Sequence, residues 1–161
     1  MTEVQTVPQS SISADVVSGV AQFLAPVVVD LTALAVDGKQ AHWHVRGANF
    51  QAVHELLDTI VDHAHDYADT AAERVVALGL PLDARIQTVG AKATNPALEA
   101  GFQQSDATIG QIIASIDATL VTVRTAVDEL AELDAVSQDV VIEIARGLEK
   151  DRWFLFAHLA G

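Results

Sequence analysis

The spacing of the apolar residues is the feature that most restricts the fold of this chain. Over most of its 161 residues, Val, Leu, Ile and Ala recur every three or four positions, which places them on one face of an α-helix. Strand-like alternation and hairpin dipeptides are absent. The first apolar stretch predicts a helix that Ser13 caps and that runs to about Val45, before Gly47. Its apolar face carries Val16, Val17, Val20, Leu24, Val27, Val28, Leu31 and Leu34.

A second long helix and a less regular segment follow. The same spacing predicts a helix from near Asn49 to Gly79, with Pro81 just beyond, which is the usual order of a glycine cap and a breaker. Residues 80–104 are less periodic and contain two prolines and two glycines. We therefore expect a long crossover there, with a short helix around residues 95–100.

Two more long helices complete the pattern. The third is expected to start after Ser105, and the turn LDAVS separates it from the fourth, which Ser137 should cap and which should reach Leu159. The sequence thus predicts an all-α fold, a ferritin-like four-helix bundle with a long crossover between helices 2 and 3. Bundles that hold no metal share this pattern, so the fold class alone does not give the function.

Composition restricts the domain organisation and the cellular setting. Half of the residues are hydrophobic but only 5 % are aromatic, so the core of one domain over residues 13–161 must be mainly aliphatic. Residues 1–12 are polar and predict a flexible tail without the features of a signal peptide. No unbroken apolar run approaches the roughly 18 residues of a membrane span. There is no cysteine, which excludes disulfides and thiolate metal sites. We expect a cytoplasmic protein that does not enter a membrane.

The charge of the chain argues against nucleic acid as a partner. Its 22 acidic and 9 basic side chains give a formal net charge of −13. Such a surface repels phosphate backbones and attracts cations. No Lys or Arg precedes Lys39, so the N-terminal arm cannot act as a basic tether for DNA.

A stripe of potential metal ligands follows the second helix. Its members are spaced by 4, 4, 3, 4 and 4 residues, which keeps them within roughly a 100° sector of the helix. Each can bind a metal through oxygen or imidazole nitrogen. A solvated helix face also carries acids, but it normally mixes in Lys or Arg, and this stripe has neither. The stripe consists of His54, Asp58, Asp62, His65, Asp69 and Glu73.

Helix geometry indicates that a metal site on this stripe is shared between chains. His54 and Asp69 are 15 residues apart, or about 22 Å along one helix, so they cannot bind the same ion within one chain. An antiparallel copy of the helix, related by a two-fold axis near Asp62, would place position 54 opposite position 70. His54 and Asp58 of one chain would then face Asp69 and Glu73 of the other, and two sites would form.

The same region resembles the signature of the Dps mini-ferritins, named as DNA-binding proteins from starved cells. The resemblance combines many fixed spacings with a His-Trp pair and covers about a fifth of the chain. It implies a hollow shell of twelve subunits that oxidises iron(II), preferentially with hydrogen peroxide, and stores iron(III) oxide inside. The matching residues are Lys39, His42, Trp43, Gly47, Asn49, Phe50, His54, Asp58, Asp69, Ala72, Glu73 and Arg74.

The resemblance also assigns roles to single residues. His42, His54 and Asp58 would form one subunit's half of a ferroxidase centre, and Asp69 and Glu73 would come from the two-fold partner. Trp43 would lie close to the centre, either to intercept oxidising equivalents or simply to pack. Lys39 and Arg74 are expected to form ion pairs that position the site rather than to bind metal.

Four histidines depart from the resemblance. His65 lies on the stripe and could hold a second metal or a hydrogen bond. His63 is interpreted as a surface residue, and His158 as a packed or terminal one. His44 stands where we expect a residue such as Asn. For all four, structural roles are favoured over functional ones.

The start of the fourth helix carries acids that could line a cation route. Asp134, Asp139 and Glu143 occupy the region where members of the family commonly form an acidic three-fold pore. Carboxylates repeated around such an axis would concentrate iron(II). The simpler interpretation is that the helix dipole favours acids in a first turn, which explains Asp139 better than Glu143.

Two other functions remain open from the sequence. A DNA-compacting protein is suggested by the family's name but disfavoured by the acidic, Lys-free arm. A metal-dependent hydrolase could use the same inter-subunit centre, because carboxylate-bound metals activate water. No nucleophile motif such as G-x-S-x-G supports hydrolysis.

Overall fold

Four long helices build the molecule, as the sequence predicts. The computed structural model describes residues 11–159, so most of the expected tail, residues 1–12, lies outside the described residues. The long helices are α1 (Ala14–His44), α2 (Phe50–Ala77), α4 (Ser105–Leu130) and α5 (Ala135–Ala157). The all-α fold class is therefore confirmed.

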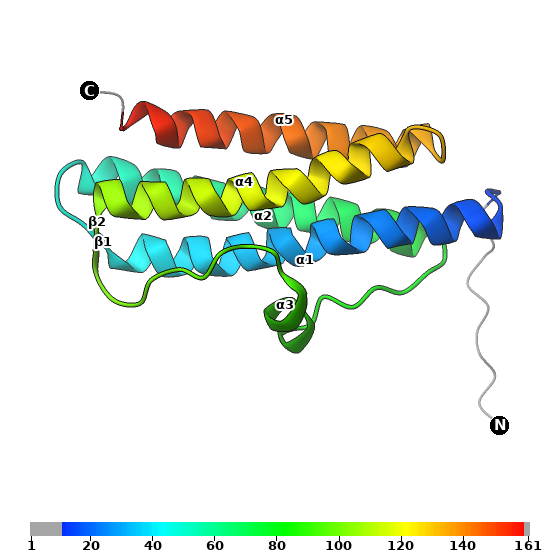
Figure 1. Cartoon of the computed structure of the whole chain (residues 1–161), viewed down its shortest axis with the longest axis horizontal. Coiled ribbons are helices and arrows are strands. Elements are labelled where there is room, and N and C mark those ends of the chain that lie inside the picture. The colour runs from blue at the N-terminus through cyan, green and yellow to red at the C-terminus, as the bar shows by residue number, and fades with distance from the viewer. Residues whose placement is uncertain (1–10, 160–161) are drawn as a thin grey trace.

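A long crossover joins the two pairs of helices, so that α2 and α4 run in the same direction (Figure 1). α1 and α2 form one antiparallel pair and α4 and α5 form another, and the green crossover runs back along the outside of α1 (Figure 1). It carries a short helix, α3 (Ile86–Lys92). At its end, β2 (Gln103–Gln104) pairs in parallel with β1 (Val45–Arg46), which follows α1. The crossover thereby returns the chain to the end of the bundle where α1 passes into α2.

The position of the short helix differs from the prediction of residues 95–100. Asp83 accepts hydrogen bonds from the Arg85 amide at 3.2 Å and the Thr88 hydroxyl at 2.7 Å, which fixes the start of α3. The predicted segment is instead irregular, because its polar groups bind α4. The Glu99 amide, for example, donates to Gln111 of α4 at 2.8 Å.

The helix cap agrees with the sequence at the start of α1 and differs at the start of α5. Ser13 caps α1 by accepting from the Val16 amide, as expected. For α5 the cap is Asp134 and not Ser137, because the Asp134 carboxylate accepts from the Ser137 amide at 2.9 Å. The aspartate lies three residues earlier, at the position from which a side chain reaches a first-turn amide.

The core is aliphatic, as the composition requires. Its largest fully buried side chains are all Leu or Ile, and they come from α1, α2, α4 and α5. By length and mean hydropathy alone, α1 and α4 would be long enough and apolar enough to cross a membrane. About half of each apolar stretch, 50 % and 44 %, lies buried inside the bundle, as in the core helices of a packed bundle. Their hydropathy therefore reflects the core that they build.

Polar contacts fasten the crossover to the bundle. Asp30 of α1 is only 1 % exposed, and its carboxylate accepts from the Thr94 amide, the Thr94 hydroxyl and the Thr122 hydroxyl at 2.6–2.8 Å. The side-chain amide of the next residue, Asn95, donates to the Ser115 hydroxyl of α4. These bonds hold the segment after α3 against α1 and α4.

α1 and α2 approach each other closely at Gly38, nearly two turns before the end of α1. A methyl group added at Gly38 would lie 2.9 Å from Cγ2 of Val61 on α2. Only glycine permits this spacing without a shift, because protein interiors are closely packed. The contact lies next to Lys39 and four residues before His42.

Candidate metal centre

A short, sterically defined turn brings the end of α1 to the start of α2. Gly47 has a φ of 99°, and a side chain there would collide with Gln104. Asn49, the N-cap of α2, has a φ of 58°, a left-handed conformation that Asn tolerates better than most residues. The turn therefore requires these residue types, and it sets His42 beside His54.

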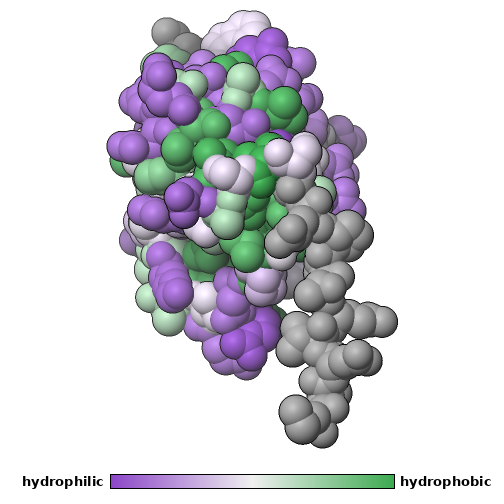
Figure 2. Space-filling view, turned by 90° about the vertical axis from the view of Figure 1, so that its right-hand side faces the viewer, coloured by the Kyte–Doolittle hydropathy of each residue, from purple (hydrophilic) through white to green (hydrophobic). Residues whose placement is uncertain are grey.

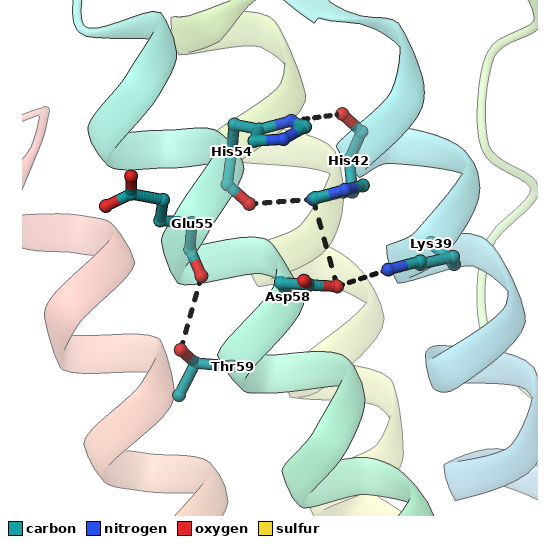
Figure 3. A network of polar contacts seen from close by, with 6 residues as sticks. All are labelled: Lys39, His42, His54, Glu55, Asp58 and Thr59. Atoms are coloured by element: carbon teal, nitrogen blue, oxygen red, sulfur yellow. Dashed lines mark hydrogen bonds and ion pairs between the residues drawn. The ribbon is translucent and has the colours of Figure 1, made fainter.

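His42 and His54 hold each other through their main chains. The Nδ1 of His42 lies 2.8 Å from the carbonyl oxygen of His54, and the Nδ1 of His54 lies 2.8 Å from the carbonyl oxygen of His42 (Figure 3). The two rings are stacked, with centroids 3.6 Å apart and planes at 20°. A carbonyl oxygen can only accept, so each Nδ1 carries the hydrogen. The Nε2 atom of each neutral ring keeps its lone pair, which is the arrangement of histidines that bind metals.

Asp58 lies beside this pair. One of its carboxylate oxygens is 4.0 Å from the Nδ1 of His42 and forms an ion pair with Lys39 (Figure 3). The hydrogen bond from Lys39 lowers the pKa of Asp58, so its carboxylate is ionised at neutral pH. Lys39 thus forms an ion pair at the site, as the sequence suggested.

Asp69 and Glu73 lie on the same helix as Asp58 but farther along it. Both side chains are exposed, and Asp69 is separated from His54 by about 22 Å of helix. Among residues 11–159, no group of three or more His, Asp or Glu side chains is arranged to hold a metal ion. One chain therefore brings together His42, His54 and Asp58, but it does not complete a metal site.

Two aromatic residues flank the histidine pair. Trp43 follows His42 and is 62 % exposed, so in the single chain it does not pack in the core. The ring of Phe50 lies 5.1 Å from that of His54. The partly exposed ring of Phe50 therefore borders the site with apolar surface.

His63 is not the plain surface residue that the sequence suggested. Its Nδ1 lies 3.0 Å from both carboxylate oxygens of Asp151 on α5, and Asp151 is 2 % exposed. Burial raises the pKa of Asp151, and His63 acts in the opposite direction. Asp151 was not among the residues predicted for a site, although its spacing of three residues from Leu148 and four from Leu155 places it on the buried face of α5.

The other three histidines lie apart from the pair. The Nδ1 of His44 lies 2.9 Å from the carbonyl oxygen of Gln40, and its ring lies 5.4 Å from that of Phe102. His65 is exposed on α2. His158 is the C-cap residue of α5 and is half-buried, in agreement with a terminal role.

The three acids considered for a pore have different surroundings. Asp134 caps α5 and accepts a hydrogen bond of 2.7 Å from Arg74 of α2. Arg74 also donates to Ser137, so it joins the end of α2 to the start of α5. Asp139 and Glu143 are exposed on α5. Of the three, only these two have carboxylates at the open surface of the chain.

Comparisons with known proteins identify the family to which the chain is similar. Residues 23–161 match the family model of the ferritin-like domain. The chain is 35 % identical over 127 residues to the DNA protection during starvation protein of Agrobacterium fabrum, and this match covers 78 % of each chain. It is 34 % identical over 146 residues to the protein of the same name from Mycolicibacterium smegmatis, covering 88 % of this chain and 78 % of the relative.

A solved structure is similar over almost the whole chain. Dps from Microbacterium arborescens, solved in its high-iron form, superposes with a TM-score of 0.91 at 57 % sequence identity. The match covers 95 % of this chain and 99 % of that one. From its sequence, its fold and these relatives together, the chain belongs to the Dps family of ferritin-like proteins.

Proposed function

We propose that this protein oxidises iron(II) with hydrogen peroxide and stores the iron(III) as oxide inside a hollow homododecamer. The observation that carries the proposal is the mutual hydrogen bonding of His42 and His54 beside Asp58. It provides two Nε2 lone pairs and one carboxylate at a half-site that a single chain leaves incomplete.

The donor set suits iron(II) as a substrate. Imidazole nitrogen and carboxylate oxygen both bind iron(II), and a small number of protein ligands leaves coordination positions open for peroxide or water. Each peroxide accepts two electrons, so two iron(II) ions are oxidised for each peroxide consumed. The Nδ1 hydrogen bonds of His42 and His54 hold the rings in one orientation, so the Nε2 atoms need not reorganise when iron binds.

The second half of the centre is assigned to the two-fold partner. Asp69 and Glu73 are exposed, lie on the same stripe of α2 as Asp58, and are too distant to reach the ion bound by their own His54. An antiparallel α2 from a second copy brings them opposite His54 and Asp58. The dimer then holds two centres, and six dimers form the shell.

Exposed apolar surface supports assembly. Figure 2 shows the end face of the bundle at which α4 turns into α5. Apolar residues gather near the centre of this face, and polar residues surround them. Val76 and Val136 are among the large apolar residues that a single chain exposes, at 54 % and 59 %. Contiguous apolar surface of this kind marks protein contacts.

Protection of the cell follows from the chemistry rather than from DNA binding. Removal of iron(II) together with peroxide prevents both from reacting elsewhere, which fits relatives named for DNA protection during starvation. A net charge of −13 opposes binding to phosphate backbones. We place this activity in the cytoplasm, without a membrane partner.

Mixed shells test the shared centre. One variant lacks both histidines (His42→Ala, His54→Ala), and the other lacks both partner acids (Asp69→Ala, Glu73→Ala). Each homogeneous shell should lose fast oxidation of iron(II) by peroxide. After dissociation and joint reassembly, a mixed dimer has one centre built from two intact halves, so activity should return to about a quarter of the unmodified level for random pairing.

A control variant separates the loss of ligands from the loss of charge. Asp66→Ala removes an exposed carboxylate from the same helix but outside the stripe, and it should oxidise iron at the unmodified rate. If mass spectrometry shows mixed shells but they remain inactive, the centre is not shared between two chains. Full activity of either homogeneous double variant would contradict the ligand assignment itself.

A further inference from the structure

A small hollow lies where α1, α4 and the end of the crossover meet. Its wall includes Gln40 and His44 of α1, Glu99 and Gln103 of the crossover end, and Thr108 of α4. The cavity volume open to the centre of a water-sized sphere is about 10 Å³. This is about the space that a single water molecule requires.

Thr108, one of the residues that line this hollow, has a buried hydroxyl without a protein partner among the described residues. The residue is 2 % exposed, and in the described part of the chain its Oγ1 makes no hydrogen bond. Thr119, on the same helix and fully buried, shows the usual situation: its Oγ1 donates to the Ser115 carbonyl at 3.0 Å and accepts from Asn95 at 2.9 Å. A buried hydroxyl that lacks such partners is unfavourable, so native proteins commonly satisfy it with water.

Other groups in the wall can complete the coordination of a water molecule. The Nδ1 of His44 lies 2.9 Å from the Gln40 carbonyl oxygen and 3.1 Å from the Gln40 side-chain nitrogen. Whether Nδ1 donates or accepts, the other nitrogen of a neutral ring is left to bond to a water molecule. The side-chain amide of Gln103 offers a further acceptor on the crossover side. Together with Thr108, these groups give the two to four polar partners that a buried water needs.

We propose that the hollow binds one ordered water molecule. The water accepts the hydrogen of the Thr108 hydroxyl and forms hydrogen bonds with other polar groups in the wall, including the His44 ring. It thereby links α4 to the last turn of α1 and to the end of the crossover. This site is separate from the iron centre, and its occupation does not depend on iron binding.

Crystallography and thermal unfolding of the assembled protein test the proposal together. In the unmodified protein we expect a density peak within hydrogen-bond distance of the Thr108 Oγ1 and of at least one other polar atom in the wall. Thr108→Val keeps the shape of the side chain but removes the hydroxyl, so it should lower the melting temperature. Thr108→Ser keeps the hydroxyl and should retain the peak.

Thr119→Val serves as the matched control, because it removes a buried hydroxyl whose partners are both protein groups, the Ser115 carbonyl of the same helix and the Asn95 side chain of the crossover. The decrease in melting temperature of Thr119→Val shows what the loss of a hydrogen-bonded, buried hydroxyl costs. The melting temperature of Thr108→Val should decrease as well. A rise in melting temperature for Thr108→Val would mean that the hydroxyl is unpaired, which overturns the proposal. It is also overturned if the peak is absent and the Thr108 hydroxyl instead bonds to the Gln104 carbonyl one turn earlier.

Discussion

Replacing Gly38 with alanine should alter the metal centre through the packing of two helices. The added methyl group would lie 2.9 Å from Cγ2 of Val61, so that either the Val61 side chain or the two helices must shift. In this densely packed core we expect α1 and α2 to move apart. Helix propensity alone favours alanine over glycine by about 1 kcal/mol. Overpacking of a dense core costs about 1–3 kcal/mol. We expect a net loss of about 1 kcal/mol, or a melting temperature lowered by roughly 2–4 °C for a chain of this length.

Gly110 of α4 provides the matched control. A methyl group added there meets no atom within 4 Å, so Gly110→Ala should show only the gain in propensity, about 0.5–1 kcal/mol. Adding Val61→Ala to Gly38→Ala removes the colliding methyl. The double variant should therefore lose less stability than the sum of the two single variants, by about 1–3 kcal/mol.

The assay compares thermal unfolding and iron(II) affinity at one protein concentration. Separation of the helices would lengthen the hydrogen bonds of 2.8 Å between His42 and His54, only four residues beyond Gly38 along α1. Iron(II) affinity should therefore fall in Gly38→Ala and recover in the variant that also carries Val61→Ala. The reasoning is refuted if Gly38→Ala raises the melting temperature as much as Gly110→Ala and binds iron(II) normally.

Three further variants test other contacts. Asp30→Ala should destabilise the protein by about 2–4 kcal/mol, because the Thr94 and Thr122 donors lose a charged acceptor that is itself buried. Hydrogen exchange should rise between residues 80 and 104, and unchanged exchange there would contradict this. Lys39→Met should raise the pKa of Asp58, because Lys39 is the main cause of its lowering. A carboxylate with a lowered pKa stays ionised to lower pH. On acidification, the Lys39→Met variant should therefore lose iron(II) binding at a higher pH than the unmodified protein does. If binding is lost at the same pH in both, Lys39 does not have this role. Asp134→Ala should lower the free energy of unfolding, measured in urea, by about 1–2 kcal/mol through loss of the helix cap. Asp134→Ser should lose less, because serine also caps helices. Equal losses in the two variants would assign the whole effect to the ion pair with Arg74.

The long helices could be predicted because their evidence is local. Apolar spacing, Ser13 and the glycine turns act within a few residues, and the bounds of α1, α2 and α4 agree with the prediction closely. The short helix was misplaced because residues 86–92 carry little apolar periodicity. Its start depends on the side chain of Asp83, and the competing segment is held by contacts with α4, which lies later in the chain.

In the candidate site too, local spacing predicts some residues, whereas contacts between distant parts of the chain could not be predicted. His54, Asp58, Asp69 and Glu73 could be selected because one helix spaces them regularly. The pairing of His63 with Asp151 joins residues 88 positions apart, and no periodicity within one helix reveals such a partner. The reciprocal bonds of the histidine pair likewise depend on the fold of the turn between α1 and α2.

The reciprocal hydrogen bonds of His42 and His54 also determine which ring atom is left to bind a proton or a metal ion. Because each Nδ1 hydrogen is held by a carbonyl oxygen, an additional proton on either ring can bind only at Nε2. That is the same atom that an incoming metal ion requires. Proton and metal therefore compete for one atom on each ring, and at acidic pH binding should release up to one proton for each histidine that coordinates. Calorimetric heats of metal binding should accordingly change with the ionisation enthalpy of the buffer.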